Sequence, residues 1–174
     1  FLGLSGPGVL KKEMVARMAD RPVIFALANP TPEIMPEEVR EVAPNAVIAT
    51  GRRDFPNQVN NVLCFPFIFR GALDTGATQI NDEMKVACVE AIAALARETA
   101  SAEVGQAYRG ERLTFGPEYL IPKPFDPRLL PTIATAVAKA AMDSGVATRQ
   151  LNLDDYTRKL QGKVYRSYNI MRDV

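Results

Sequence analysis

The feature that most constrains the fold is an unbroken apolar run from Pro22 to Ala28, which ends at Asn29 and Pro30. A short apolar run bounded by turn-forming residues is typical of a strand buried on both faces of a parallel sheet. Two further strand-like runs and two short helical segments accompany it: Phe1 to Leu4, 11–19, 37–42 and Ala46 to Thr50. Strands that alternate with short helices predict an α/β fold with a doubly wound parallel sheet.

After Arg52 the pattern changes from strands to helices. Asn81 is expected to cap a helix in which Met84, Cys88 and Leu95 recur at helical spacing. Further helices are expected in three stretches, the first broken or kinked by its proline: 60–72, 132–142 and 154–174. The expected organisation is a sheet unit, a helical segment and a helical tail or linker: 1–59, 60–150 and 151–174.

Composition excludes several classes of function. Twenty acidic residues balance twenty-one basic ones, so neither nucleic acid nor an anionic membrane is an expected partner. No apolar run reaches the roughly 18 residues of a membrane span, and no secretory signal is recognisable, so we expect a cytoplasmic protein. The chain has no histidine, which excludes a histidine base or an imidazole zinc ligand within it. Cys64 and Cys88 lie far apart in apolar surroundings, which is the pattern of neither a disulfide framework nor a metal site, so they are expected to be buried packing residues.

Asn29 is the first candidate for ligand binding. An amide that follows a buried parallel strand faces the side of the sheet where open α/β folds bind their ligands. The amide can hold a carboxylate, a hydroxyl or a nicotinamide carboxamide, because it both donates and accepts hydrogen bonds. Equally, Asn29 and Pro30 could form a turn that only ends the strand.

Two other segments carry candidate residues. The stretch from Arg52 to Asn61 is rich in amides, and Asn60 with Asn61 could lie at a helix N-terminus that suits an anion, or could simply cap a turn. The turn from Ser5 to Gly8 lacks both common phosphate-binding glycine patterns, so simple backbone geometry explains it as well as a ligand does. In the stretch 121–128, a proline-rigid connection with solvated or paired charges is favoured over an acid/base site.

Read together and in order, these segments resemble the bacterial malic enzymes. The resemblance rests on stretches that run from the first residue to about Arg149: Gly3 to Gly8, Phe25 to Ile34, Ala49 to Arg52, Asp54 to Leu63, Phe69 to Asp74, and Phe115 to Tyr119 through Pro127 and Arg128. Single motifs are ambiguous, but the ordered set is specific.

The resemblance implies the second half of a Rossmann-like sheet, followed by a mainly helical segment that closes a substrate site. It implies oxidative decarboxylation of malate to pyruvate and carbon dioxide with NAD or NADP, assisted by Mg²⁺ or Mn²⁺. By resemblance, Asn29 and Asn60 bind the substrate, whereas Ser5, Gly6, Asn29 and Asn61 lie near the cofactor. No catalytic or metal-binding residue is expected in this chain.

The resemblance also implies that the family's tyrosine and lysine acid/base pair, its metal ligands and its glycine fingerprint precede Phe1. The opening apolar run without an initiator methionine suggests a fragment, which alone is expected to be inactive. The missing amino-terminal part of the enzyme and a second copy of the chain are therefore expected partners. By resemblance, the tail beyond Asp154 corresponds to the stretch that leads into a phosphotransacetylase-like domain in the longer bacterial forms.

Two alternatives stay open at the level of sequence. One is another nicotinamide-dependent dehydrogenase that acts on a small carboxylate, although the amides between Asp54 and Leu63 favour a malic enzyme. The other is a non-catalytic module for oligomer contacts or for regulation by acetyl-CoA or another metabolite, a role that the helical second half would suit.

Overall fold

The structure is a computed structural model that describes residues 1–99, 105, 108 and 113–172. The chain forms two compact units, which we describe separately. Unit 1 comprises Phe1–Asn60 and Gly110–Ile121, and unit 2 comprises Asn61–Arg109 and Pro122–Val174. The return of the chain to unit 1 in the later segment is not part of the organisation expected from sequence, which assigned 60–150 to one helical segment.

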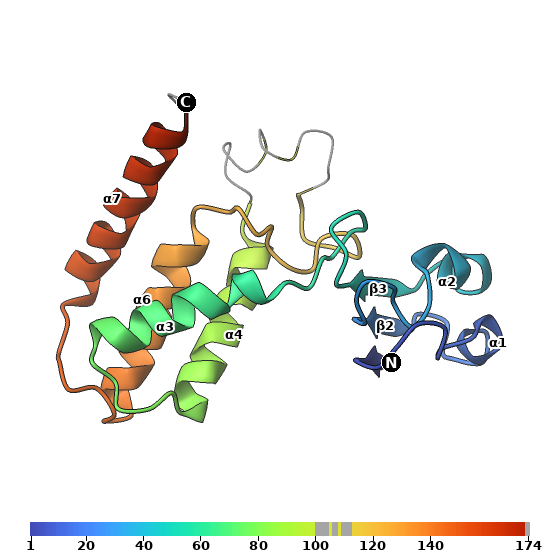
Figure 1. Cartoon of the computed structure of the whole chain (residues 1–174), viewed down its shortest axis with the longest axis horizontal. Helices are drawn as coiled ribbons and strands as arrows, with labels where there is room; N and C mark the ends of the chain where they lie inside the picture. Colours follow the sequence, from blue (N-terminus) through green and yellow to red (C-terminus); the bar gives the residue numbers. More distant parts are fainter. Residues whose placement is uncertain (100–104, 106–107, 109–112, 173–174) are drawn as a thin grey trace. The chain divides into compact units, whose positions relative to one another are not determined.

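Unit 1 is built on a three-stranded parallel sheet (Figure 1). Its strands are β1 (Leu2–Gly3), β2 (Val23–Ala26) and β3 (Val47–Thr50), in the order β1-β2-β3. Gly3 lies opposite Ala26, and Ala26 lies opposite Thr50, so the three strands end at one level. This is the α/β, Rossmann-like arrangement predicted from the alternating apolar runs.

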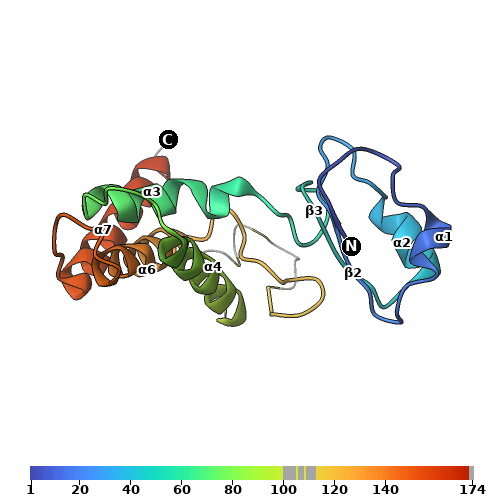
Figure 2. The same cartoon turned by 90° about the horizontal axis from the view of Figure 1, so that it is seen from below.

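Both helices of unit 1 cover the same face of the sheet (Figure 2). They are α1 (Lys12–Val15) and α2 (Pro36–Val42), which connect consecutive neighbouring strands. Crossovers between parallel strands are almost always right-handed, so successive connections in one direction along the sheet place their helices on one side. Ile24 and Ala26 of β2 face these helices and are fully buried.

The expectation that β2 is buried on both faces is therefore wrong for the described part of the chain. Val23 points to the opposite face and is 52% exposed, and Phe25 is only partly buried. The continuous apolar run predicts that both faces of β2 are buried, whereas α1 and α2 pack on only one face of the sheet.

Unit 2 is helical. After a 3₁₀ turn, η1 (Asn61–Leu63), the described residues of this unit form four longer helices: α3 (Phe65–Asp74), α4 (Asp82–Arg97), α6 (Leu129–Asp143) and α7 (Leu153–Arg172). α6 packs against each of the other three, and its Ala134, Val137 and Ala138 are fully buried. The predicted cap of α4 is confirmed, because the Oδ1 atom of Asn81 accepts a hydrogen bond of 3.1 Å from the N–H of Met84.

Small residues let the helices of unit 2 approach closely. A Cβ atom at Gly71 of α3 would lie 2.6 Å from the carbonyl oxygen of Ala134 and 2.8 Å from Cβ of Val137. Pro66 does not break or kink a helix as expected, since it lies in the first turn of α3, where a missing N–H costs nothing. The helical segment is instead interrupted at Cys64, which lies between η1 and α3, two residues before Pro66. Within the described residues, no helix is long and apolar enough to cross a membrane.

Candidate functional site

The candidate residues of unit 1 lie at the carboxyl edge of the sheet, where the carboxyl ends of the three parallel strands meet. The chain leaves β1 through Ser5 and Gly6, leaves β2 through Asn29, and leaves β3 toward Asn60. Because the strands are parallel and in register, these exits share one edge. Ser5 and Asn29 are exposed, and Gly6 and Asn60 are partly exposed. This is the edge at which open α/β sheets bind ligands.

Glu33 joins the first two of these exits. Its side chain is fully buried, and its Oε1 atom accepts a hydrogen bond of 2.8 Å from the N–H of Ser5. Its Oε2 atom accepts one of 3.1 Å from the N–H of Ala28, directly before Asn29. The carboxylate thus holds the Ser5 turn and the Asn29 turn side by side.

The charge state of Glu33 follows from these contacts. Burial by itself raises the pKa of a carboxyl, but the hydrogen bonds from Ser5 and Ala28 favour the ionised form. Together they leave the pKa of Glu33 below its ordinary value of 4.5. Glu33 is not among the site residues predicted from the sequence. The available signal was a single acid between Pro32 and Ile34 in an otherwise apolar and proline-rich turn.

Gly51 positions Asn29 from the neighbouring strand. A Cβ atom at Gly51 would lie 2.5 Å from Nδ2 and 2.9 Å from Oδ1 of Asn29. The Asn29 amide therefore packs directly against the backbone that follows β3, and no larger residue fits at Gly51 without displacing it. The peptide bond between Asn29 and Pro30 is cis, which the sequence alone did not indicate.

The amide side chains of the stretch from Arg52 to Asn61 differ in their burial. Asn57 is buried and has a left-handed backbone with φ of 57°. Its Nδ2 atom donates to the carbonyls of Ile48 (2.9 Å) and Pro117 (2.6 Å), and its Oδ1 atom accepts from the N–H of Leu120 (2.8 Å). Asn57 therefore fastens the segment 113–121 to β3 and is not available to a ligand.

Asn60 and Asn61 differ in their placement. Asn60 ends the first part of unit 1, whereas Asn61 is exposed and begins η1 in unit 2. The expected helix N-terminus at this pair is only a three-residue 3₁₀ turn. The longer helix α3 begins after it, with Cys64 as its N-cap residue.

The charged stretch 121–128 has a structural role in unit 2. The side chain of Asp126 is fully buried and accepts from Nε of Arg128 at 3.0 Å and from Nη2 at 2.7 Å. Arg128 also donates to the carbonyl of Thr99 at 2.8 Å. The pair ties the start of α6 to the chain beyond α4, in agreement with the preference for a structural role over an acid/base site.

The edge offers hydrogen-bonding groups rather than titrating ones. Its exposed Asn29 amide, the Ser5 hydroxyl and the adjacent backbone suit a polar or anionic organic ligand. Among the described residues, no group of three or more Cys, Asp or Glu side chains could hold a metal ion. The geometry therefore supports orientation of a ligand, and we assign no acid/base or metal chemistry to these side chains.

Comparison with known proteins agrees with this geometry. The family model for the malic enzyme NAD-binding domain matches residues 1–108. The NAD-dependent malic enzyme of Rhizobium meliloti (strain 1021) is 64% identical over all of this chain, which spans 23% of that protein. The NADP-dependent malic enzyme of Salmonella typhimurium is 62% identical, again over all of this chain and 23% of the relative.

Solved structures give the same result. The malic enzyme from Pyrococcus horikoshii Ot3 has a TM-score of 0.80 and 36% identity, covering 99% of this chain and 36% of that one. The malic enzyme of Entamoeba histolytica has a TM-score of 0.78 and 34% identity, covering 99% of this chain and 33% of that one. The chain therefore spans about a third or less of the relatives it matches.

Proposed function

This chain belongs to the malic enzyme family through its NAD-binding domain, and from that premise we propose that it is the part of an NAD(P)-dependent malic enzyme that orients the substrate and the nicotinamide. The observation that carries the proposal is the convergence of Ser5 and Asn29 at one sheet edge, held together by Glu33. The reaction is conversion of malate to pyruvate and carbon dioxide, in which NAD⁺ or NADP⁺ accepts the hydride from C2.

We propose a ligand-binding role for each of the three asparagines. The Asn29 side chain donates its N–H to a malate carboxylate, and Asn60 does the same from the segment that follows β3. Asn29 also lies near the cofactor, Asn61 pairs with the nicotinamide carboxamide, and the turn of Ser5 and Gly6 lies against the nicotinamide ribose. The fit of the dinucleotide is supported by the exposure of Ser5 and Asn29 and by the open space beside Gly6, where an added Cβ would meet no atom within 4 Å.

The proton chemistry and the metal are proposed to reside on the rest of the enzyme. The Mg²⁺ or Mn²⁺ ion would polarise the keto oxygen, but the described residues offer no ligand group for it. A homo-oligomer is a further proposal that follows from the resemblance, and a cytoplasmic location is one that follows from the sequence pattern alone.

The choice between NAD and NADP is proposed to lie outside this chain. Relatives described as NAD-dependent and NADP-dependent match it at 64% and 62% identity. Such similar values for two cofactor preferences support a shared nicotinamide-end architecture, with the discriminating contacts elsewhere in the enzyme.

The test is a malate-dependent assay of NAD(P)H formation on the full-length enzyme with Mn²⁺. Loss of a hydrogen bond to a charged group costs about 1.5–3 kcal/mol, so we expect Asn29→Ala and Asn60→Ala each to lower kcat/KM by about 10- to 100-fold. Asn45→Ala is the matched control, because Asn45 is an exposed asparagine before the amino end of β3. If the two site variants lose no more activity than the control, the proposed roles are wrong.

Gly51→Ala provides a second test that does not remove the amide. The added methyl would displace the Asn29 side chain, because it would lie 2.5 Å from its Nδ2 atom. We expect a raised KM for malate with a folded enzyme, as judged by an unchanged circular dichroism spectrum. An unchanged KM would show that the orientation of Asn29 does not matter to substrate binding.

A further inference from the structure

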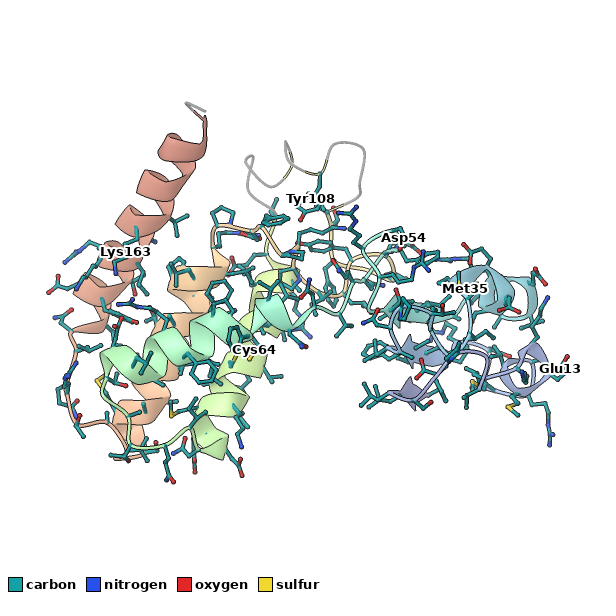
Figure 3. The ribbon with its side chains drawn as sticks, viewed as in Figure 1. Glu13, Met35, Asp54, Cys64, Tyr108 and Lys163 are labelled. Carbon is teal, nitrogen blue, oxygen red and sulfur yellow. The ribbon has the colours of Figure 1, made fainter. Side chains whose placement is uncertain are left out.

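Two cysteines that are distant in sequence meet in unit 2. The Sγ atoms of Cys64 and Cys88 lie 3.4 Å apart, as a thiol hydrogen bond. Cys64 precedes α3, where it is labelled in Figure 3, and Cys88 lies within α4. The expected burial is confirmed for Cys88, whereas Cys64 is only partly buried. The packing of α3 and α4 brings together these two residues, which are 24 positions apart.

The two thiols differ in their access to solvent. Cys88 is 1% exposed, whereas Cys64 is partly exposed. Burial, followed by the hydrogen bond to Cys64, raises the pKa of Cys88 to about 12. Cys88 is thus held as a thiol away from solvent, and Cys64 is the member of the pair that a reagent can reach first.

Cys64 is hydrogen-bonded to Asn61, which is one of the residues of the proposed cofactor site. Its backbone N–H donates to the carbonyl of Asn61 at 3.0 Å and so closes the turn η1. Its own carbonyl accepts from the N–H groups of Phe67 and Ile68 in the first turn of α3. A covalent bond at Cys64 would restrain the junction between the turn that begins at Asn61 and the helix behind it.

We propose that Cys64 and Cys88 form a reversible disulfide, a modification site whose oxidant is a low-molecular-weight disulfide. The Cys64 thiolate attacks one sulfur of the oxidant, which forms a mixed disulfide and releases one thiolate. Cys88 then loses its proton and attacks the Cys64 sulfur, which releases the second thiolate. The two released thiolates take up the two protons that Cys64 and Cys88 lost. Two cysteine thiols are oxidised and one disulfide is reduced to two thiols. The sulfurs need to close from 3.4 Å to about 2.0 Å.

The chemistry of the pair is independent of malate turnover, and only its bearing on the nicotinamide contact of Asn61 rests on the proposed function. The test therefore uses neither malate nor cofactor. The full-length protein is incubated with oxidised glutathione, treated with N-ethylmaleimide and digested with trypsin. Cleavage after lysine and arginine places the two cysteines in separate peptides: Asp54 to Arg70 and Val86 to Arg97.

We expect mass spectrometry to show these two peptides joined by a disulfide, which dithiothreitol reverses. In Cys88→Ser the glutathione adduct should accumulate on Cys64, because the resolving thiol is gone. In Cys64→Ser no adduct should form on the buried Cys88 of the folded protein. The wild-type peptide map is sufficient to test the disulfide, so a folding defect in either variant does not change the conclusion. A wild-type protein with a lasting adduct on Cys64 and an alkylated Cys88, or with both cysteines unoxidised, would overturn it.

Discussion

Among single residues, Glu33 makes hydrogen bonds whose loss should measurably lower the stability of the chain. We expect Glu33→Gln to lower the free energy of unfolding by about 1.5–3 kcal/mol at neutral pH, because a neutral amide accepts more weakly and turns an N–H toward one of the two backbone donors. Urea denaturation at pH 7 measures the difference. Glu13→Gln is the control, since Glu13 is exposed and lies in the first turn of α1; an equal effect of both changes would contradict the role given to Glu33.

The same residue predicts a pH dependence. The pKa of Glu33 is lower in the folded chain than the ordinary value of 4.5, so its contribution is fully present above that value. As the pH falls below 4.5, the unfolded chain binds the proton first and the contribution is lost through the folded pKa. Denaturation curves from pH 7 down to about pH 3 should therefore show the gap between wild type and Glu33→Gln shrinking. A gap that stays constant would mean that the ionised carboxylate is not what holds Ser5 and Ala28.

Asn57 combines a backbone requirement with a side-chain requirement, and two substitutions separate them. Asn57→Gly keeps the left-handed backbone but loses the hydrogen bonds to Ile48, Pro117 and Leu120. Asn57→Ala loses those bonds and also strains the backbone, so it should be less stable than Asn57→Gly by about 1 kcal/mol. Chemical denaturation of both variants measures this, and equal stabilities would show that the backbone there relaxes.

Between elements, the contact of α3 with α6 depends on the absence of a side chain at Gly71. Alanine is intrinsically better than glycine in a helix by about 1 kcal/mol, yet Gly71→Ala would put a methyl 2.6 Å from the Ala134 carbonyl oxygen. We expect net destabilisation of about 1–3 kcal/mol, as for other overpacked cores.

A matched glycine tests the same reasoning with the opposite sign. Gly162 lies in α7, is exposed, and an added Cβ would meet no atom within 4 Å. Gly162→Ala should therefore raise the melting temperature, whereas Gly71→Ala lowers it. Thermal denaturation of the two variants gives the comparison, and a stabilised Gly71→Ala would mean that α3 and α6 can separate at little cost.

At the scale of the whole molecule, each unit has a hydrophobic cluster of its own. One cluster lies between the sheet and its two helices, and another joins α6 to α7. Local stability then follows local packing. We expect Glu33→Gln to speed amide hydrogen exchange in β1 to β3 and not in α4 or α6, and Gly71→Ala to do the reverse. Exchange that rises throughout the chain in both variants would show that the units unfold as one.

Local sequence patterns determined much of this protein. The apolar runs predicted three parallel strands, and Asn81 with the spacing of Met84 and Cys88 predicted α4, because these signals act within one element. Pro66 was harder to place, since a proline ends one helix or starts another depending on where the first turn lies. The proposed ligand-binding roles of Asn29 and Asn60 came from an ordered resemblance and stay predictions.

Tertiary structure decided which residues meet. Only the parallel register puts the exits of the strands at one edge, with a buried Glu33 between two of them. Only the return of 113–121 to the sheet gives Asn57 its hydrogen bonds to Pro117 and Leu120, and only the packing of α3 and α4 pairs Cys64 with Cys88. The physical reason is that periodicity and capping report the preferences of neighbouring residues, whereas contacts across tens of residues depend on how complete elements pack.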